Sequence, residues 1–478
     1  MDYEPIECKC GGDKEEDKLL GSSTPIATTF KLNIPGFFFS IASAFQDAID
    51  LYFIKKGFGT DGVTIVSIAS IIRQLVVGYS YFHMQGTCSK FSEMIATKSY
   101  REACKLYVEM IRMSIILGVF ATLGLALSVP YIMPLMGIPE NLVVSARNYL
   151  MPIACLPFFS LNLTISASIV LACGRANWYS FINISALAIS LGADPVFIYI
   201  FKAPIDFMGI AYISGPVSLS ILLLFLFSMN RFCISPNWKE LITKPSAQFW
   251  NLIYLSIPST LSITLSSITP VVFSIFLKKS SEETGYSTEI CTVYSTTMKV
   301  YSMLIIAIQG GTSGIAPSVS YALHKGESKR LYRLFEFGHL IPMLTVFVIS
   351  PIMIINPEII IKIWIKDENM LSFVEKISPI PFYTTFIEPF VQIVAPLVIV
   401  FGHYGLATIA PIVKASSLMI ASLVMTKLMK TNSISVLYSL TIQDSLNFIA
   451  SLVVILYVLH EYKSNYHALS PSTSQQEI

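Results

Sequence analysis

The sequence predicts an all-α integral membrane protein with twelve transmembrane helices in two six-helix bundles related by a parallel internal repeat. Three observations lead to this fold class: the composition, the length of the apolar stretches, and a weak repeat between the two halves of the chain. Hydrophobic residues make up 54% of the 478 residues and charged residues only 13%, whereas a soluble domain carries about 25% charged residues. We therefore expect lipid to be the solvent of most of the chain.

Twelve apolar stretches are long enough to cross a bilayer. A hydrocarbon core of about 30 Å requires about 20 apolar residues in one helix, because every backbone polar group must be satisfied within the segment. The predicted spans are residues 30–54, 62–84, 110–133, 148–172, 178–201, 208–229, 249–277, 292–322, 335–360, 376–402, 405–429 and 433–459.

The polar segments between these spans predict the domain organisation and the orientation. We expect a polar tail at 1–28, a six-helix bundle at 29–232, a linker at 233–248, a second bundle at 249–460 and a tail at 461–478. With both tails cytoplasmic, and with Lys31, Arg112, Lys376 and Lys427 near the span ends included, the inner segments hold 18 Lys and Arg and the outer loops hold 11. This bias favours the orientation. The first segment lacks the pattern of a cleavable signal peptide. The sequence leaves open whether the plasma membrane or an internal membrane holds the protein.

The composition and motifs exclude several classes of function. The net charge is only +2 and the basic residues form no stripe with interleaved aromatics, so no nucleic acid partner is expected. No CxxC or Cys/His spacing indicates a metal site, and no GxxxxGK motif followed by Ser or Thr indicates an ATPase. An intramembrane aspartyl protease would need a GxGD element, which residues 192–195 lack. We therefore expect no catalytic residues, no metal and no cofactor.

The two halves of the sequence resemble each other at separate places. A shift of 228 residues aligns two short loops, and a shift of 223 aligns residues 33–35 with residues 256–258 near the start of each half. Because each half holds an even number of spans, the halves enter the membrane in the same orientation. The pairs aligned by the larger shift are Gly86 with Gly314, Ser92 with Ser320, Arg101 with Lys329, Lys105 with Arg333, and Gly174 with Gly402.

Four carboxylates lie within the predicted spans: Asp50, Asp194, Glu388 and Asp444. An acidic side chain at bilayer depth costs about 2.5–3.5 kcal/mol on insertion scales, so these residues should face a protein interior or a water-filled cavity. Such a carboxylate can take up a proton or hold a cation. Arg73, within the second span, is expected to neutralise the interior aspartates. Purely structural roles stay open for three of these residues: Asp50 could end a helix, Asp194 could cap a kink before a proline, and Asp444 could form a structural salt bridge with Lys414.

An ordered set of motifs over residues 30–460 resembles the multidrug and toxic compound extrusion (MATE) family, in the superfamily that includes lipid-linked oligosaccharide flippases. The resemblance rests on Pro35 followed by Asp50, the loop at 86–101, Gly174 with Arg175, the run 194–198, the run 209–212, and Glu388 with Gln392. The chain departs from the family at Ser190, where prokaryotic members typically carry Asn, and in the seventh span, which has no acidic residue.

The resemblance implies a role for each of these residues. Asp50 and Asp194 would bind the coupling ion, H⁺ or Na⁺, with Asn162 and Ser190 as neighbouring hydrogen-bond partners. Glu388 and Gln392 would form a substrate or proton site. Pro35 would kink the first helix, either to control access or as a fixed packing feature. The departure at Ser190 puts Na⁺ coordination in doubt more than protonation.

The sequence therefore predicts a monomeric secondary transporter in the lipid bilayer that exports small organic, cationic compounds in exchange for H⁺ or Na⁺ by alternating access. The alternative is a lipid-linked oligosaccharide or polysaccharide flippase of the same superfamily. That function requires a cationic central cavity suited to diphosphate headgroups, and the predicted interior charge is mixed. A channel or receptor is disfavoured because an internal repeat with an intramembrane acid in each half is typical of alternating access.

Overall fold

The computed structural model of the chain describes residues 18–80, 84–135, 142–232, 234, 236–282, 287–363, 365, 368–428 and 433–469. Within these ranges the chain forms helices and connecting turns, without a strand. Most of the predicted first tail and half of the predicted last tail, residues 1–17 and 470–478, lie outside the described residues.

The helices follow one another with short connections. In the first part of the chain they are η1 (Lys18–Ser22), α2 (Pro25–Ser80), α3 (Met84–Ala96), α4 (Tyr100–Leu135), α5 (Val143–Ile153), α6 (Leu156–Ala172), α7 (Ala176–Pro195), η4 (Val196–Ile200), η5 (Ile205–Phe207), α8 (Met208–Ser228) and η6 (Trp238–Ile242). In the second part they are α9 (Ala247–Glu282), α10 (Ser287–Gly311), α11 (Ile315–His324), α12 (Ser328–Gly338), α13 (Leu340–Ile355), α14 (Glu358–Ile361), α15 (Glu368–Ile377), η7 (Ile380–Phe382), η8 (Thr385–Ile387), α16 (Glu388–Val400), α17 (Tyr404–Ala407), α18 (Ile409–Leu428) and α19 (Ser433–Leu469).

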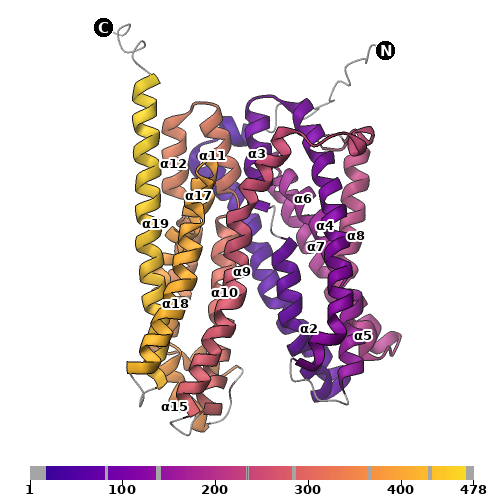
Figure 1. Cartoon of the computed structure of the whole chain (residues 1–478), viewed down its shortest axis with the longest axis vertical. Helices are drawn as coiled ribbons and strands as arrows, with labels where there is room; N and C mark the ends of the chain where they lie inside the picture. Colours follow the sequence, from indigo (N-terminus) through magenta and orange to yellow (C-terminus); the bar gives the residue numbers. More distant parts are fainter. Residues whose placement is uncertain are drawn as a thin grey trace. The chain divides into compact units, whose positions relative to one another are not determined.

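Ten helical segments of the described chain are long and apolar enough to cross a membrane. They correspond to ten of the twelve predicted spans. The other two predicted spans, 62–84 and 249–277, fall in the last third of α2 and in α9 (Figure 1). Residues 62–80 and 249–277 are helical, whereas residues 81–83 and several side chains of both segments lie outside the described residues.

The first two predicted spans are separated by a single backbone break. Gly59 adopts φ 67° and ψ −151° inside α2, a conformation that favours glycine because it has no Cβ. In a straight helix, residues 23 positions apart lie about 34 Å from each other. Arg73 nevertheless contacts Asp50, so the chain must reverse direction at this break.

The chain divides into two compact units. The first comprises Met1–Thr260 with Gln309–Gly338, and the second comprises Leu261–Ile308 with His339–Ile478. This division differs from the repeat halves, because α11 and α12 belong to the second half of the sequence but pack on α2 and α3 in the first unit. The predicted bundle boundaries at 29–232 and 249–460 describe the repeat rather than the packing, and they stay a prediction.

Reciprocal packing inside the first unit supports the predicted repeat. Gly86 of α3 approaches Leu255 and Ser256 of α9, with 3.1 Å from its virtual Cβ to the Cβ of Leu255. Its repeat counterpart Gly314 approaches Leu32 and Asn33 of α2, and its backbone N–H donates to Asn33 Oδ1 over 2.7 Å. The shift of 223 residues aligns Leu32 with Leu255 and Asn33 with Ser256, so the two contacts are equivalent under the repeat.

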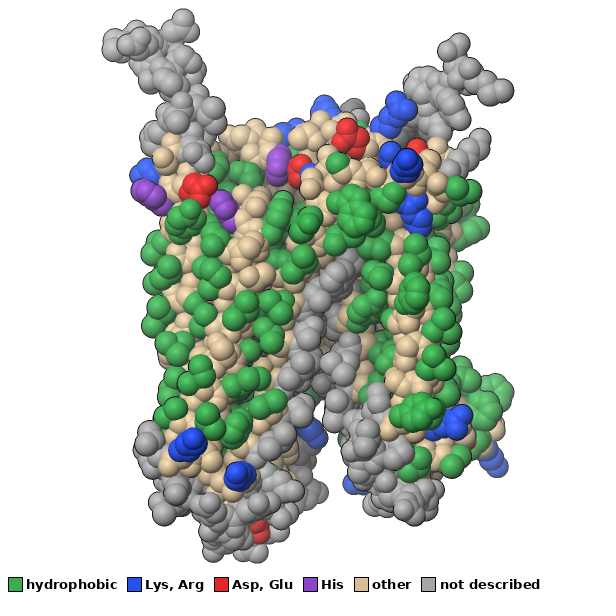
Figure 2. All heavy atoms as spheres, viewed as in Figure 1, with side chains coloured by type: hydrophobic (Ala, Val, Ile, Leu, Met, Phe, Trp, Pro, Cys, Tyr) green, Lys and Arg blue, Asp and Glu red, His purple; other side chains and the backbone are tan. Residues whose placement is uncertain are grey.

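The outer faces of the helices are apolar. Figure 2 shows hydrophobic side chains over much of the drawn face and charged side chains mainly near the helix ends. On α4, for example, Phe120, Leu127 and Tyr131 are each more than 70% exposed. In the second unit, α18 and α19 run side by side (Figure 1), and Ile420 and Val453 of this pair are exposed. Such surfaces fit contact with lipid.

The helices α7 and α8 approach each other closely at Gly215. A Cβ at this position would overlap the backbone carbonyl of Ala186 and lie 2.7 Å from Ser190 Oγ. The Gly215 N–H also donates to Ser190 Oγ over 3.2 Å. Small residues at helix crossings allow this backbone approach in membrane proteins, where packing rather than apolar burial drives association.

We therefore expect Gly215→Ala to destabilise the first unit by about 1–3 kcal/mol, because overpacking at a rigid backbone contact forces the helices apart. The measurement is the thermal unfolding temperature of the purified protein in detergent. Gly192→Ala on α7 is the matched control, because no atom lies within 4 Å of its virtual Cβ. A Gly215→Ala variant that unfolds at the wild-type temperature would contradict the close approach.

Candidate functional site

The first unit contains a buried ion pair between the two parts of α2. Arg73 Nη1 donates to Asp50 Oδ2 over 2.7 Å, and the side chains are only 4% and 7% exposed, respectively. The prediction that Arg73 neutralises an interior aspartate is thus confirmed. A pair buried to this degree is costly to desolvate, and it is retained only when further contacts hold both members in place.

Two tyrosines hold the Arg73 guanidinium. Arg73 Nη1 also donates to the hydroxyl of Tyr149 on α5 over 3.2 Å. The guanidinium carbon lies 4.4 Å from the ring centroid of Tyr212 on α8, within the range of a cation–π contact. These contacts come from three different helices, so the position of the charge is fixed by the packing of the unit.

Asp194 joins this pair from the end of α7. Its side chain is buried, and its carboxyl is close enough to Asp50 to share a hydrogen bond. Two carboxyl groups share a hydrogen bond only when one of them carries a proton. The helix ends at Pro195 and continues as the π-helical turn η4. Asp194 therefore also lies at a helix irregularity before a proline, which is the purely structural role that the sequence left open for it.

The other predicted residues of the first site engage different partners. Asn162 on α6 accepts a hydrogen bond from Ser114 Oγ over 2.6 Å and donates to the Phe158 carbonyl over 3.2 Å. Ser190 on α7 donates to the Tyr212 carbonyl over 2.8 Å. Their role as ligands of a coupling ion stays a prediction. Pro35 lies inside α2, where its missing N–H removes one backbone hydrogen bond.

The second unit contains a similar cluster on α16, α18 and α19. Lys414 Nζ donates to Glu388 Oε1 over 2.9 Å and lies 3.8 Å from Asp444 Oδ1. The carboxylate side chains are 1% and 3% exposed, whereas Lys414 is 28% exposed. The predicted pairing of Lys414 with Asp444 is present, but the shorter contact goes to Glu388.

Neutral donors complete the second cluster. Gln392 Nε2, one turn after Glu388, donates to Glu388 Oε2 over 3.3 Å. Asp444 Oδ2 accepts from Thr384 Oγ1 over 2.8 Å, and Asp444 Oδ1 accepts from Gln443 Nε2 over 3.0 Å. The predicted pair of Glu388 and Gln392 is thus in direct contact, and its function as a substrate or proton site stays a prediction.

Each cluster holds two carboxylates and one cation. With every group ionised, each has a net charge of −1, and uptake of one proton or one monovalent cation makes it neutral. The residues that hold these charges, Tyr149, Tyr212 and Thr384, were not among the predicted site residues. Aromatic and hydroxyl side chains are common in apolar spans, so their positions alone gave no signal.

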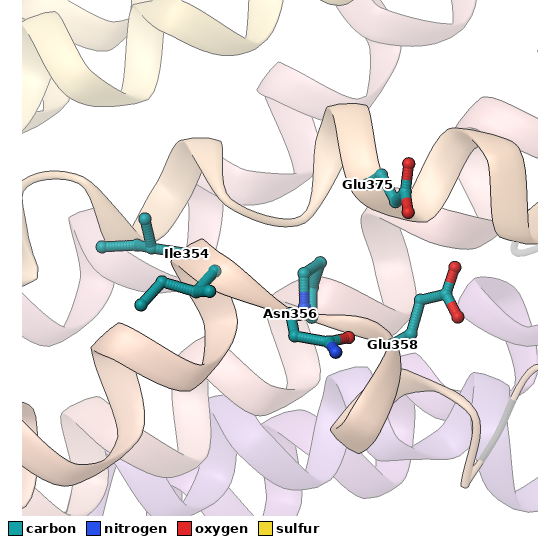
Figure 3. A pocket seen from close by; sticks show the side chains of 6 residues that line it. Ile354, Asn356, Glu358 and Glu375 are labelled. Carbon is teal, nitrogen blue, oxygen red and sulfur yellow. The ribbon is translucent and has the colours of Figure 1, made fainter.

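A cavity of about 430 Å³ lies elsewhere in the second unit, after α13. Its lining includes Asn356, Glu358 and Glu375 (Figure 3). Glu358 is already paired with Lys362, and none of the predicted site residues lines this cavity. Within the described part of the chain, no three His, Cys, Asp or Glu residues are grouped as metal ligands.

The sequence matches the MatE family profile over residues 35–196 and 283–421, which is more than half of the chain. The chain belongs to the MatE family. This confirms the resemblance, and members of this family are transporters. A comparison with curated proteins gave no match.

Solved structures of MATE transporters share the fold of this MatE protein. A multidrug resistance MATE transporter in an outward-facing conformation superposes with a TM-score of 0.84 at 16% identity, covering 94% of this chain and 98% of that one. A MATE in complex with MaL6 gives 0.83 at 16%, covering 94% and 99%. A transporter of the MOP superfamily from Pyrococcus furiosus Vc1, described as having a binding pocket of reverse polarity, superposes with a TM-score of 0.83 at 16% identity. The match covers 94% of this chain and 98% of that one. These matches confirm the twelve-helix membrane fold.

For this MatE protein, we expect Arg73→Met to reduce the free energy of unfolding by about 3–5 kcal/mol, because it removes the cation from a buried ion pair. Combining it with Asp50→Asn should restore part of the loss, since the buried charge then disappears as well. Thermal unfolding of both single variants and the double variant measures the coupling. Lys299→Met on α10, at an exposed lysine, is the control. Strictly additive losses would show that the two residues do not interact.

Proposed function

We propose that this MatE protein exports organic cations in exchange for H⁺ by alternating access. The observation that carries the proposal is the buried cluster of Asp50, Asp194 and Arg73. A cluster with two acids and one fixed base changes its charge by one unit when it binds one proton. That change in a buried site provides a differential affinity, and only a differential affinity can shift the balance between two conformations.

The geometry favours a proton over Na⁺ as the coupling ion. Arg73 contacts Asp50 at 2.7 Å, so a metal cation there would lie beside a fixed positive charge. The oxygen atoms of Asn162 and Ser190, which a sodium site would use, are engaged with Ser114 and with the backbone of α8. A proton requires no new ligands, because it can bind between the carboxyl groups of Asp50 and Asp194.

The second cluster supports a cationic substrate. Glu388 and Asp444 together carry one more charge than Lys414 neutralises, so the cluster attracts a monovalent cation. Export of several drugs is consistent with the structural neighbour described as a multidrug resistance transporter. A lipid-linked oligosaccharide flippase, the alternative, would need excess positive charge to hold diphosphate, and neither cluster has one: each is negative with every group ionised and neutral after uptake of one proton.

The remaining properties follow from the sequence. The excess of Lys and Arg in the predicted inner segments supports cytoplasmic tails, in either the plasma membrane or an internal membrane. We propose that the protein works as a monomer in the lipid bilayer, without a cofactor. Bending of α2 near Pro35, where one backbone hydrogen bond is missing, could couple the state of the first cluster to access.

The test is uptake of a fluorescent organic cation into proteoliposomes with an imposed pH gradient or an imposed Na⁺ gradient. We expect transport by the wild type under the pH gradient alone. Asp194→Asn should reduce it to the leak rate, because the amide cannot take up the proton. Asp50→Asn should have the same effect.

Asp206→Asn is the matched control for this experiment. Asp206 lies in the same unit, in η5, and contacts Asn148 rather than the cluster. Its removal should leave pH-driven transport unchanged. Transport by the wild type under a Na⁺ gradient only would refute proton coupling, and full transport by both Asp50→Asn and Asp194→Asn would refute the assignment of the site.

A further inference from the structure

The two clusters differ in how their cations are held. Arg73 is fixed by contacts from three helices and is 4% exposed. Among the described residues, the ammonium group of Lys414 contacts the two carboxylates of its cluster, and its side chain is 28% exposed. Lysine carries a compact charge on a flexible four-carbon stem. Lys414 can therefore leave its partners by rotation of its own side chain, whereas Arg73 cannot.

The exposed member of the second cluster covers the buried members. The side chains of Glu388 and Asp444 are 1% and 3% exposed. Further hydrogen bonds to them come from neutral side chains: Gln392, Thr384, Gln443 and Tyr301. Lys414 is the most exposed of the three charged groups, so a cation that pairs with both carboxylates takes the place of its ammonium. It must then also replace the hydrogen bond that the ammonium donates.

We infer that the ammonium of Lys414 competes with cationic substrates for Glu388 and Asp444, and that this competition determines which cations bind. Its ammonium marks the place where a protonated amine binds between Glu388 and Asp444. The inference rests on the proposed export of organic cations and names the substrate class: amines that carry N–H donors. In the empty site Lys414 compensates the buried carboxylates, and a substrate ammonium takes over this role as the side chain swings towards its exposed side.

A nearby acceptor favours a ligand with N–H groups. Asn447 follows Asp444 by three residues on α19, which places it on the same helix face. It is 2% exposed, and its Oδ1 atom has no hydrogen-bond partner within the described part of the chain. A buried acceptor without a partner is costly. A protonated primary or secondary amine has more than one N–H to donate, whereas a quaternary ammonium has none.

The experiment is calorimetric binding to the purified full-length protein with two matched probes, phenethylamine and its N,N,N-trimethyl derivative. We expect Lys414→Met to bind phenethylamine at least about tenfold more tightly than the wild type. Removal of one partner of a buried charge pair usually changes binding affinity by more than tenfold. The gain for the trimethyl probe should be smaller, because it cannot replace the hydrogen bonds. Lys427→Met, at an exposed lysine on the same helix, should leave both affinities unchanged.

Lys414→Arg covers the case in which Lys414→Met fails to fold. The guanidinium keeps the charge and can form two parallel hydrogen bonds with a carboxylate, so it is harder to displace. Phenethylamine should bind this variant several-fold more weakly than the wild type. Unchanged phenethylamine affinity in the Lys414 variants, or an equal gain for both probes, would overturn the inference while leaving proton-driven export intact. Absence of cation transport by the wild type would instead refute the proposed function.

Discussion

Compensation of buried carboxylates in an apolar environment governs this structure. The chain buries Asp50, Asp194, Glu388 and Asp444 to exposures of 1–5%, in helices whose outer faces are hydrophobic. Each would be too costly alone. The fold meets this constraint twice in the same way, with one cation for two acids. Local features such as the reversal of α2 at Gly59 are necessary for it, since without the break Arg73 could not reach Asp50.

The residue type of each cation, and the contacts that hold it in place, determine whether its cluster is suited to exchange a proton or an organic cation. An arginine held by Tyr149 and Tyr212 remains charged and in place, so the first cluster responds to its surroundings through a proton on a carboxyl group. A lysine with an exposed stem can be replaced by another ammonium group, so the second cluster is suited to an organic cation. The two clusters thus divide the proposed exchange between a proton site and a substrate site.

The sequence predicted the features that depend on hydropathy and missed those that depend on packing. The spans and the interior carboxylates were predictable because lipid penalises exposed charge. The alignment of Gly86 with Gly314 was predictable because close helix contacts admit few residue types, and the reciprocal contacts support it. The stronger pairing of Lys414 with Glu388 rather than Asp444 was not predictable, since it depends on how α16, α18 and α19 pack. For the same reason the packing of α11 and α12 in the first unit was not predictable from the sequence.

The division into units also determines where the backbone passes from one to the other. It does so three times: within α9 after Thr260, within α10 after Ile308, and between α12 and α13 after Gly338. Two of these crossings are uninterrupted helix, which resists bending. Glycines lie at or beside the second and third crossings: Gly310 and Gly311 follow the crossing in α10, and Gly338 stands at the third. The units are thus connected through the backbone at three places, and a change in the orientation of one unit against the other requires a change of backbone dihedral angles at these places.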